Sequence, residues 1–171
     1  MKRLAVLVCA ALPAKQIQIL VALAQDEDWD VSVFATPNAR AFIDEPLLAQ
    51  KIGHSVFTTT PTEPLASFTL AVVIPATFNT LRKWTQGITD TYVLELLWQW
   101  TQQQSCPILV FPRASAELAQ DPAFAPSLNW LQQHQIDVFY QPELYPPNNN
   151  IPWNKVMDNI RSISHENEDA T

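Results

Sequence analysis

The sequence predicts an α/β protein with a three-layer α/β/α architecture around a doubly wound parallel sheet. Three apolar runs, at 4–9, 70–74 and 107–111, lack polar alternation and are too short for buried helices. Such runs are typical of strands that are buried on both faces of a parallel sheet. Stretches with helical spacing separate the runs, and this alternation of strands with helices is the pattern of a doubly wound fold.

The first third of the chain is expected to form two strands with a helix between them. The run at 4–9 leads through a turn at 10–15 into an amphipathic helix that ends near Gln25. A second strand is predicted at 31–35. Thr36 is then placed to cap a helical segment, because a threonine hydroxyl accepts hydrogen bonds from backbone N–H groups two or three residues further on.

The N-terminus and the cysteines bear on the cellular location. Lys2 and Arg3 stand in front of an apolar run, as in a secretory signal peptide, but cleavage would delete the first strand of the sheet. We therefore expect this segment to be a strand. Cys9 and Cys106 make neither a metal-binding spacing nor a disulfide framework, which predicts a cytoplasmic protein.

The stretch 70–91 is predicted to contain the strand and the helix around which the site is organised. The strand is expected to end at Pro75, because proline has no backbone N–H to donate. Polar residues follow directly, and after them comes a single helical pattern. Its apolar face is predicted to carry Leu81, Trp84, Ile88 and Tyr92.

The rest of the chain is predicted to continue the alternation. The expected elements are a helix and turn over 44–57 with the turn at Gly53 and His54, a helix at 93–103, a strand at 107–111, a helix at 126–134 and a strand at 136–140. We treat 1–171 as one domain, with a core at about 4–140 and a Pro/Asn-rich segment at 141–171. Within that segment a helix is predicted at 151–163 and disorder at 165–171.

The composition argues against several classes of partner. A net charge of −7 and a pI near 4.8 argue against nucleic acid, since phosphate binding needs concentrated Lys and Arg. No apolar run is long enough to span a membrane. Neither of the two glycines, Gly53 and Gly87, follows the first strand, so the GxGxxG fingerprint of dinucleotide binding is absent, as is a P-loop. A phosphate-bearing small ligand would be held by backbone amides and hydroxyls.

Hydroxyl and amide side chains follow three of the predicted strands. They are Thr36, the group Thr77, Asn79 and Thr80, and Ser115. Because the carboxyl ends of parallel strands lie on one edge of a doubly wound sheet, these groups are expected to converge and to hold a phosphate and a polar ring edge. The alternative is that each of them only caps a helix.

Two segments resemble the signature of a family of flavin mononucleotide (FMN) proteins. PATFNT at 75–80 matches Pro-Ala-(Ser/Thr)-x-Asn-Thr, and GITD at 87–90 matches Gly-Ile-(Ala/Ser)-Asp. The family includes phosphopantothenoylcysteine decarboxylase, the lantibiotic peptidyl-cysteine decarboxylases and the flavin prenyltransferases. VSVFATPNARAFI at 31–43 is similar to the family's second strand and loop, and the resemblance covers roughly 4–140.

The resemblance implies a Rossmann- or flavodoxin-like fold with FMN bound at the strand ends. In the decarboxylase branch the motif asparagine also helps to position the substrate. Asn79 matches it and is therefore the best candidate for a catalytic residue acting on an unknown small-molecule substrate. The cofactor-binding residues that the resemblance implies are Ala10, Ala11, Thr36, Ala76, Thr77, Asn79, Thr80, Ala114 and Ser115.

The resemblance also implies a homo-oligomer, a trimer or a multiple of trimers, with the flavin near a subunit interface. Trp98 and Trp100 are two residues apart on a predicted helix and cannot share a face. One of them is therefore expected to point at a neighbouring subunit.

The chain departs from the family at positions that serve decarboxylation. The family's histidine before the Pro-Ala strand has no counterpart in 66–69, and His54 is interpreted as a surface turn residue. The Pro-x-Met-Asn segment is replaced at 112–115, where Arg113 either binds an anionic substrate or is a solvated surface residue. The first loop, at 10–13, lacks the usual Gly and Ser.

Three hypotheses follow for the function. The first is an FMN-binding flavoprotein that acts as an oxidoreductase or a decarboxylase-like enzyme on an unknown substrate. The alternative is a non-catalytic FMN-binding or regulatory member of the same fold. The third is an unrelated Rossmann-like domain for a nucleotide or a nucleotide-sugar.

Overall fold

Five parallel strands form the centre of the protein in this computed structural model, which describes residues 1–147 and 150–169. The strand order is β2-β1-β3-β4-β5, and all four neighbouring pairs are parallel. The strands are β1 (Arg3–Val8), β2 (Asp30–Ala35), β3 (Leu70–Thr77), β4 (Ile108–Arg113) and β5 (Asp137–Val138). The predicted α/β class and doubly wound parallel sheet are therefore confirmed.

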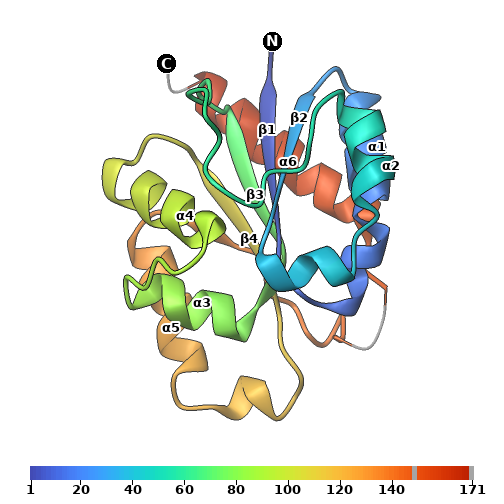
Figure 1. Cartoon of the computed structure of the whole chain (residues 1–171). Helices are drawn as coiled ribbons and strands as arrows, with labels where there is room; N and C mark the ends of the chain where they lie inside the picture. The colour runs from blue at the N-terminus through green and yellow to red at the C-terminus, as the bar shows by residue number, and fades with distance from the viewer. Residues whose placement is uncertain (148–149, 170–171) are drawn as a thin grey trace.

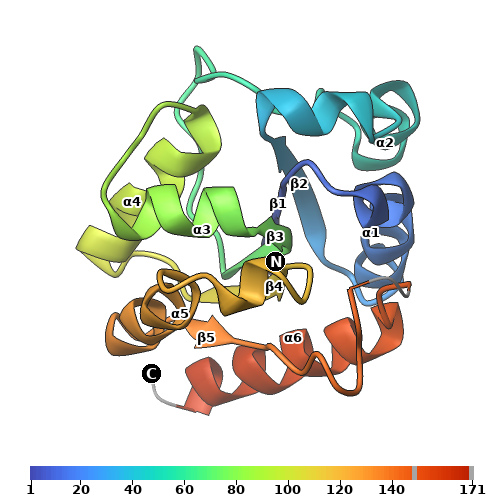
Figure 2. The same cartoon turned by 90° about the horizontal axis from the view of Figure 1, so that it is seen from below.

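Helices cover both faces of the sheet (Figure 1). The α-helices are α1 (Ile17–Gln25), α2 (Glu45–Ile52), α3 (Phe78–Thr85), α4 (Tyr92–Gln103), α5 (Phe124–Gln133) and α6 (Trp153–Asp169). Short 3₁₀ helices are η1 (Leu12–Gln16), η2 (Pro37–Ala41) and η3 (Leu118–Gln120). Figure 2 shows α1, α2 and α6 on one side of the sheet and α3, α4 and α5 on the other.

The central strand β1 is buried on both faces and divides the core into two parts. Leu4, Val6 and Val8 pack with the residues of α1 and α6, whereas Ala5 and Leu7 pack with those of α3, α4 and α5. Alternate residues of a strand point to opposite faces, so an unbroken apolar run fills both layers. This is the physical reason why the apolar runs predicted the parallel strands correctly.

The prediction that β3 ends at Pro75 is wrong, because the strand continues to Thr77. The Ile74–Pro75 peptide bond is cis, and the pairing of β3 with β4 shifts register between Val73 and Ala76. A proline is tolerated in a strand where the ladder is irregular, since no partner carbonyl there requires its missing N–H. The strand thereby delivers Thr77 to the carboxyl edge of the sheet.

The single helical pattern predicted after β3 is in fact two helices. Helix α3 ends at Thr85 and α4 begins at Tyr92, and Gly87 between them has a φ of 71°. A glycine in the left-handed region is a common helix terminator. Ile88, which was expected on the buried face, lies in this connection and is 40% exposed.

Replacing Gly87 with alanine is expected to lower the free energy of unfolding by about 2 kcal/mol, because the new residue would adopt a positive φ. The added Cβ would also lie 3.2 Å from Cη2 of Trp98. Gly53→Ala is the matched control, since Gly53 has a φ of 79° but nothing within 4 Å of the added Cβ. We expect about 1 kcal/mol there, from backbone strain alone. Urea denaturation measures both values, and an equal loss in the two variants would contradict the role of Trp98.

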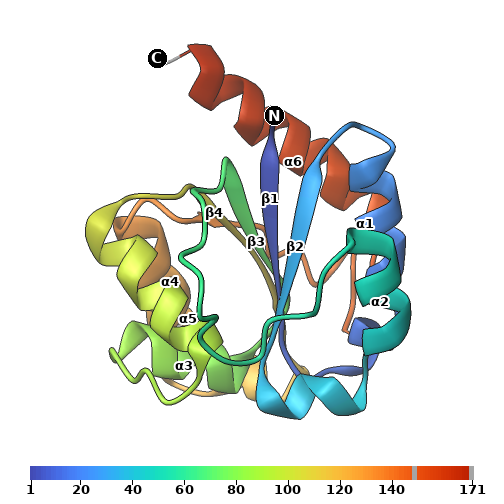
Figure 3. The same cartoon turned by 45° about the horizontal axis from the view of Figure 1, so that its top comes forward.

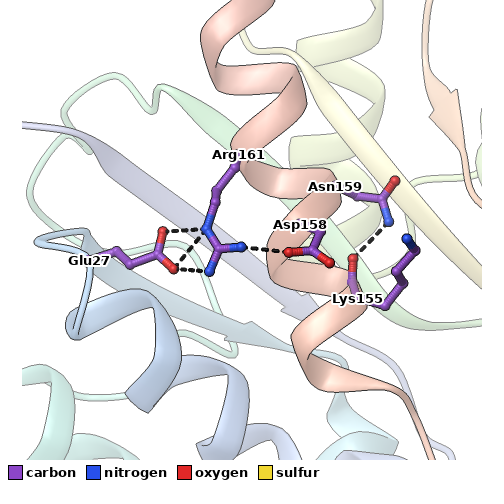
Figure 4. A network of polar contacts seen from close by, with 5 residues as sticks. All are labelled: Glu27, Lys155, Asp158, Asn159 and Arg161. Carbon is purple, nitrogen blue, oxygen red and sulfur yellow. Dashed lines mark hydrogen bonds and ion pairs between the residues drawn. The ribbon is translucent and has the colours of Figure 1, made fainter.

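The C-terminal helix is longer than predicted. The expected helix at 151–163 and disordered tail at 165–171 are replaced by α6, which runs to Asp169, while 170–171 lie outside the described residues. Arg161 on α6 binds the carboxylate of Glu27 through Nε and Nη2, at 3.0 and 2.5 Å from Oε1, and also binds Asp158 at 2.6 Å (Figure 4). These contacts hold α6 against the α1–β2 loop near the N-terminus (Figure 3).

The two tryptophans of α4 both pack within the same chain. Trp100 is buried between Phe34 and Phe68, and Trp98 stacks on Trp130 with ring centroids 6.2 Å apart. Neither needs a neighbouring subunit for these contacts.

No helix in the described part of the chain is long and apolar enough to span a bilayer.

Candidate functional site

A polar cleft of about 240 Å³ lies at the carboxyl edge of the sheet, the edge that faces the viewer in Figure 2. The strand order reverses between β1 and β3, because the chain passes from β1 to β2 on one side and to β3 on the other. Open α/β sheets bind their ligands at such a switch point. The lining residues are Ala10, Thr36, Pro37, Asn38, Thr77, Asn79, Thr80, Lys83, Thr91 and Leu94.

Three threonines that line the cleft cap the helices around it. The hydroxyl of Thr36 accepts from the N–H of Ala39 at 3.3 Å in η2. Thr77 accepts from Thr80 at 3.4 Å in α3, and Thr91 accepts from Leu94 at 3.3 Å in α4. These threonines cap helices and also lie together around one cleft. Helix capping and ligand binding are therefore compatible roles for the hydroxyls.

The electrostatics of the cleft favour an anion. Among the described residues that line it, none carries a carboxylate, and Lys83 supplies a cation. The Nζ of Lys83 lies 2.6 Å from Oδ2 of Asp90, which is not a lining residue. The first turns of α3 and α4 add the positive ends of two helix dipoles and N–H groups that have no partner within the helix.

Five of the nine predicted cofactor-binding residues line the cleft: Ala10, Thr36, Thr77, Asn79 and Thr80. The other four do not. Ala76 is fully buried in β3, and Ala114 is buried in the core beside α5. The hydroxyl of Ser115 accepts from the N–H of Leu118, the first residue of η3, at 3.2 Å. Ala11 is half-buried at the start of η1.

The prediction missed Pro37, Asn38, Lys83, Thr91 and Leu94. Usable signals existed for some of them. Thr91 directly follows the GITD segment, and a threonine before an apolar helix is a typical N-cap. Asn38 stands two residues after Thr36 in the loop that follows β2. Nothing in the sequence indicated that Lys83, on the last turn of α3, reaches the same cleft as these two.

The thiol of Cys9 lies beneath the cleft, next to Ala10. Burial raises its pKa, while hydrogen bonds with Thr80 and Thr77 act in the opposite direction. Burial also raises the pKa of Cys106, to about 12. Both cysteines are free and buried, so both are expected to be thiols at neutral pH.

Neither thiol is expected to react with iodoacetamide in the folded protein at about pH 8, because the thiolate is the reactive form. Both are expected to react once the protein is unfolded in guanidinium. Mass spectrometry of the alkylated peptides measures this, and Cys106→Ser isolates the signal of Cys9. Rapid labelling of native Cys9 would show that its sulfur is accessible from the cleft.

Arg113 lies apart from this cleft, in a smaller cavity of about 50 Å³ at the ends of β4 and β5. Its guanidinium donates to the carbonyl oxygen of Pro147, and burial lowers its pKa. Phe111 and Phe139 line the same cavity and belong to the core on the side of α6. Arg113 is therefore a partly buried residue held by a backbone carbonyl, and its binding of an anionic substrate stays a prediction.

Comparisons of this chain with known proteins identify its family and show similar folds. A family model described as Flavoprotein matches residues 2–164. No curated protein matches this chain. Among solved structures, HAL3 from Cryptococcus neoformans is 18% identical with a TM-score of 0.81, and the match covers 98% of each chain. The FMN-dependent cysteine decarboxylase TvaF from thioviridamide biosynthesis is 19% identical with a TM-score of 0.79, covering 96% of this chain and 99% of that one. The peptidyl-cysteine decarboxylase EpiD is 18% identical with a TM-score of 0.73, covering 92% and 98%.

Proposed function

This chain belongs to the Flavoprotein family, and from that premise we propose that its polar cleft binds FMN. The observation that supports this most directly is the convergence of three threonine-capped helix starts around a cleft without a lining carboxylate. The cleft also lies at the β1/β3 switch point of a 2-1-3-4-5 sheet, where flavodoxin-like folds bind FMN. The hypothesis of an unrelated Rossmann-like domain is excluded by the family match.

The chemistry of the lining residues fits a phosphate and a polyol. Thr36, Thr77, Thr80 and Asn79 offer hydroxyl and amide donors, and the first turns of α3 and α4 offer backbone N–H groups. Ala10 has a small side chain at the end of β1, which leaves room for a ligand to approach the backbone. These five residues would hold the phosphate and the ribityl chain.

The size of the cleft suggests that part of the flavin extends beyond it. Pockets for small molecules usually measure about 300–1,000 Å³, and this cleft measures about 240 Å³. We propose that Ala76, Ala114 and Ser115 contribute to the remainder of the site. A second subunit would cover the exposed part of the ring, in a homo-oligomer built of trimers.

When bound, FMN would supply redox chemistry at its ring. TvaF is an FMN-dependent cysteine decarboxylase, and its similarity supports an enzymatic function for this chain. The chain would then be a cytoplasmic oxidoreductase or decarboxylase-like enzyme. Asn79 would lie beside its small-molecule substrate. A non-catalytic, FMN-binding role is the second candidate. It is favoured by one observation: the three histidines of the chain are all among the described residues, and none lines the cleft.

The purified protein is expected to quench FMN fluorescence on binding, and Asn79→Ala is expected to weaken FMN binding about tenfold, the effect of one lost hydrogen bond to a charged group. Asn79 is exposed, so the fold should be unaffected. Asn129→Ala, at an exposed position on α5, is the matched control and should bind like the wild type. Failure of the wild type to bind FMN, or equal affinities in all three proteins, would overturn the proposed site.

A further inference from the structure

Lys83 has a position that the capping residues do not share. It lies in the last turn of α3, and its side chain lines the cleft that the first turn of the same helix borders. Long side chains on a helix point back toward its N-terminus, which accounts for this reach. The Lys83 side chain therefore lies beside a cleft in which the helix dipoles already favour negative charge.

In the free protein this ammonium is bound to a carboxylate outside the cleft. Nζ of Lys83 lies 2.6 Å from Oδ2 of Asp90, and the two side chains are 31% and 50% exposed. Asp90 belongs to the connection between α3 and α4, directly before Thr91, which caps α4 and lines the cleft. The Lys83 side chain thus lines the cleft, while its ammonium binds the carboxylate of Asp90 at the edge of the cleft.

An exposed ion pair of this kind contributes little to stability, because water screens the charges and both side chains lose freedom. A phosphate monoester carries nearly two negative charges at neutral pH and forms stronger, charge-assisted hydrogen bonds with an ammonium. Transfer of the Lys83 ammonium from Asp90 to a phosphate in the cleft is therefore favourable. Replacing Asp90 with a neutral residue would free the Lys83 ammonium for the phosphate. It would also remove a negative charge that repels the phosphate.

We propose that Lys83 makes this cleft selective for the phosphorylated flavin over riboflavin, and that Asp90 competes with the phosphate for the Lys83 ammonium. This inference rests on the proposed function, since it assigns a specificity-determining residue to the same site. Selectivity arises because riboflavin offers no anion for which Lys83 would leave Asp90. Asp90 sets how strongly the cleft binds FMN without contacting the flavin itself.

The test compares the dissociation constants of FMN and riboflavin, measured by fluorescence quenching, in the wild type and three variants. Lys83→Met keeps the aliphatic stem and is expected to weaken FMN binding about tenfold, with riboflavin affinity changed less than about twofold. Asp90→Asn is expected to strengthen FMN binding by about two- to fivefold and to leave riboflavin unchanged. Arg82→Met removes the same charge from an exposed neighbouring position and should change neither constant.

The outcomes separate this inference from the proposed function. A wild type that binds neither flavin overturns both. A wild type that binds FMN, with an unchanged ratio of FMN to riboflavin affinity in Lys83→Met, overturns the selectivity of Lys83 alone. Weaker FMN binding in Asp90→Asn would show that Asp90 positions the ammonium, which overturns the competition. Circular dichroism of each variant verifies that the fold is kept.

Discussion

Trp84→Ala is expected to lower the free energy of unfolding by about 3–5 kcal/mol, the usual range for a large aromatic side chain removed from a core. Trp84 is fully buried among the residues of α3, α4 and α5. Its indole N–H donates to the hydroxyl of Thr101 at 3.1 Å, and this hydroxyl donates to the carbonyl of Leu97 at 2.6 Å. The side chain therefore joins α3 to α4, the two helices whose first turns border the cleft.

Thr101→Val separates the hydrogen bond from the packing. It removes the acceptor of the Trp84 indole and leaves that buried N–H unsatisfied, which is expected to lower the free energy of unfolding by about 1–3 kcal/mol. Urea denaturation followed by circular dichroism measures both variants. If Thr101→Val were as destabilising as Trp84→Ala, the hydrogen bond, rather than the buried ring, would hold α3 to α4.

Ala10→Leu is expected to weaken FMN binding by about a hundredfold, because the larger side chain would occupy the space left for the ligand. Ala10 follows β1 and lines the cleft at the switch point of the sheet. It is half-buried, so the added atoms extend into the cleft and should change the thermal denaturation midpoint little. Titration of the variant with FMN, followed by flavin fluorescence, measures the effect.

Ala11→Leu is the matched control, with the same change one residue further along the chain. Ala11 is also half-buried, but it does not line the cleft. We expect its FMN affinity to stay within about threefold of the wild type, since the side chain is directed elsewhere. An equal loss in both variants would place Ala11 in the site. Normal binding by Ala10→Leu would mean that FMN binds outside this cleft.

The accuracy of the sequence-based predictions depends on whether a feature is set by nearby residues. Helix α1 ends at Gln25 as expected, and β1 and β2 lie where the apolar runs predicted them. Thr36 caps its helical turn as proposed. Apolar period and capping act over a few residues, so these features can be predicted from the local sequence.

The wrong predictions concern features that depend on distant contacts. Continuation of β3 past Pro75 depends on an irregular pairing with β4 that no local pattern indicates. Helix α6 packs against α1, and its Arg161 binds Glu27, which is 134 residues away in the chain; the local sequence of the C-terminal segment does not indicate these contacts. Gly87 is the exception, because a glycine in a helical pattern was a local signal that the helix stops.

The sequence by itself determined the alternation of buried strands with helices and the two segments, at 75–80 and 87–90, that indicated the family. Only the tertiary structure decided which loops surround the cleft. Thr91 and Lys83 line it, while Ser115 accepts a hydrogen bond from Leu118 and does not line it, although all three lie near strand or helix ends. The physical reason is that strand order and helix packing, which are made by contacts far apart in the chain, determine which strand ends meet at the switch point.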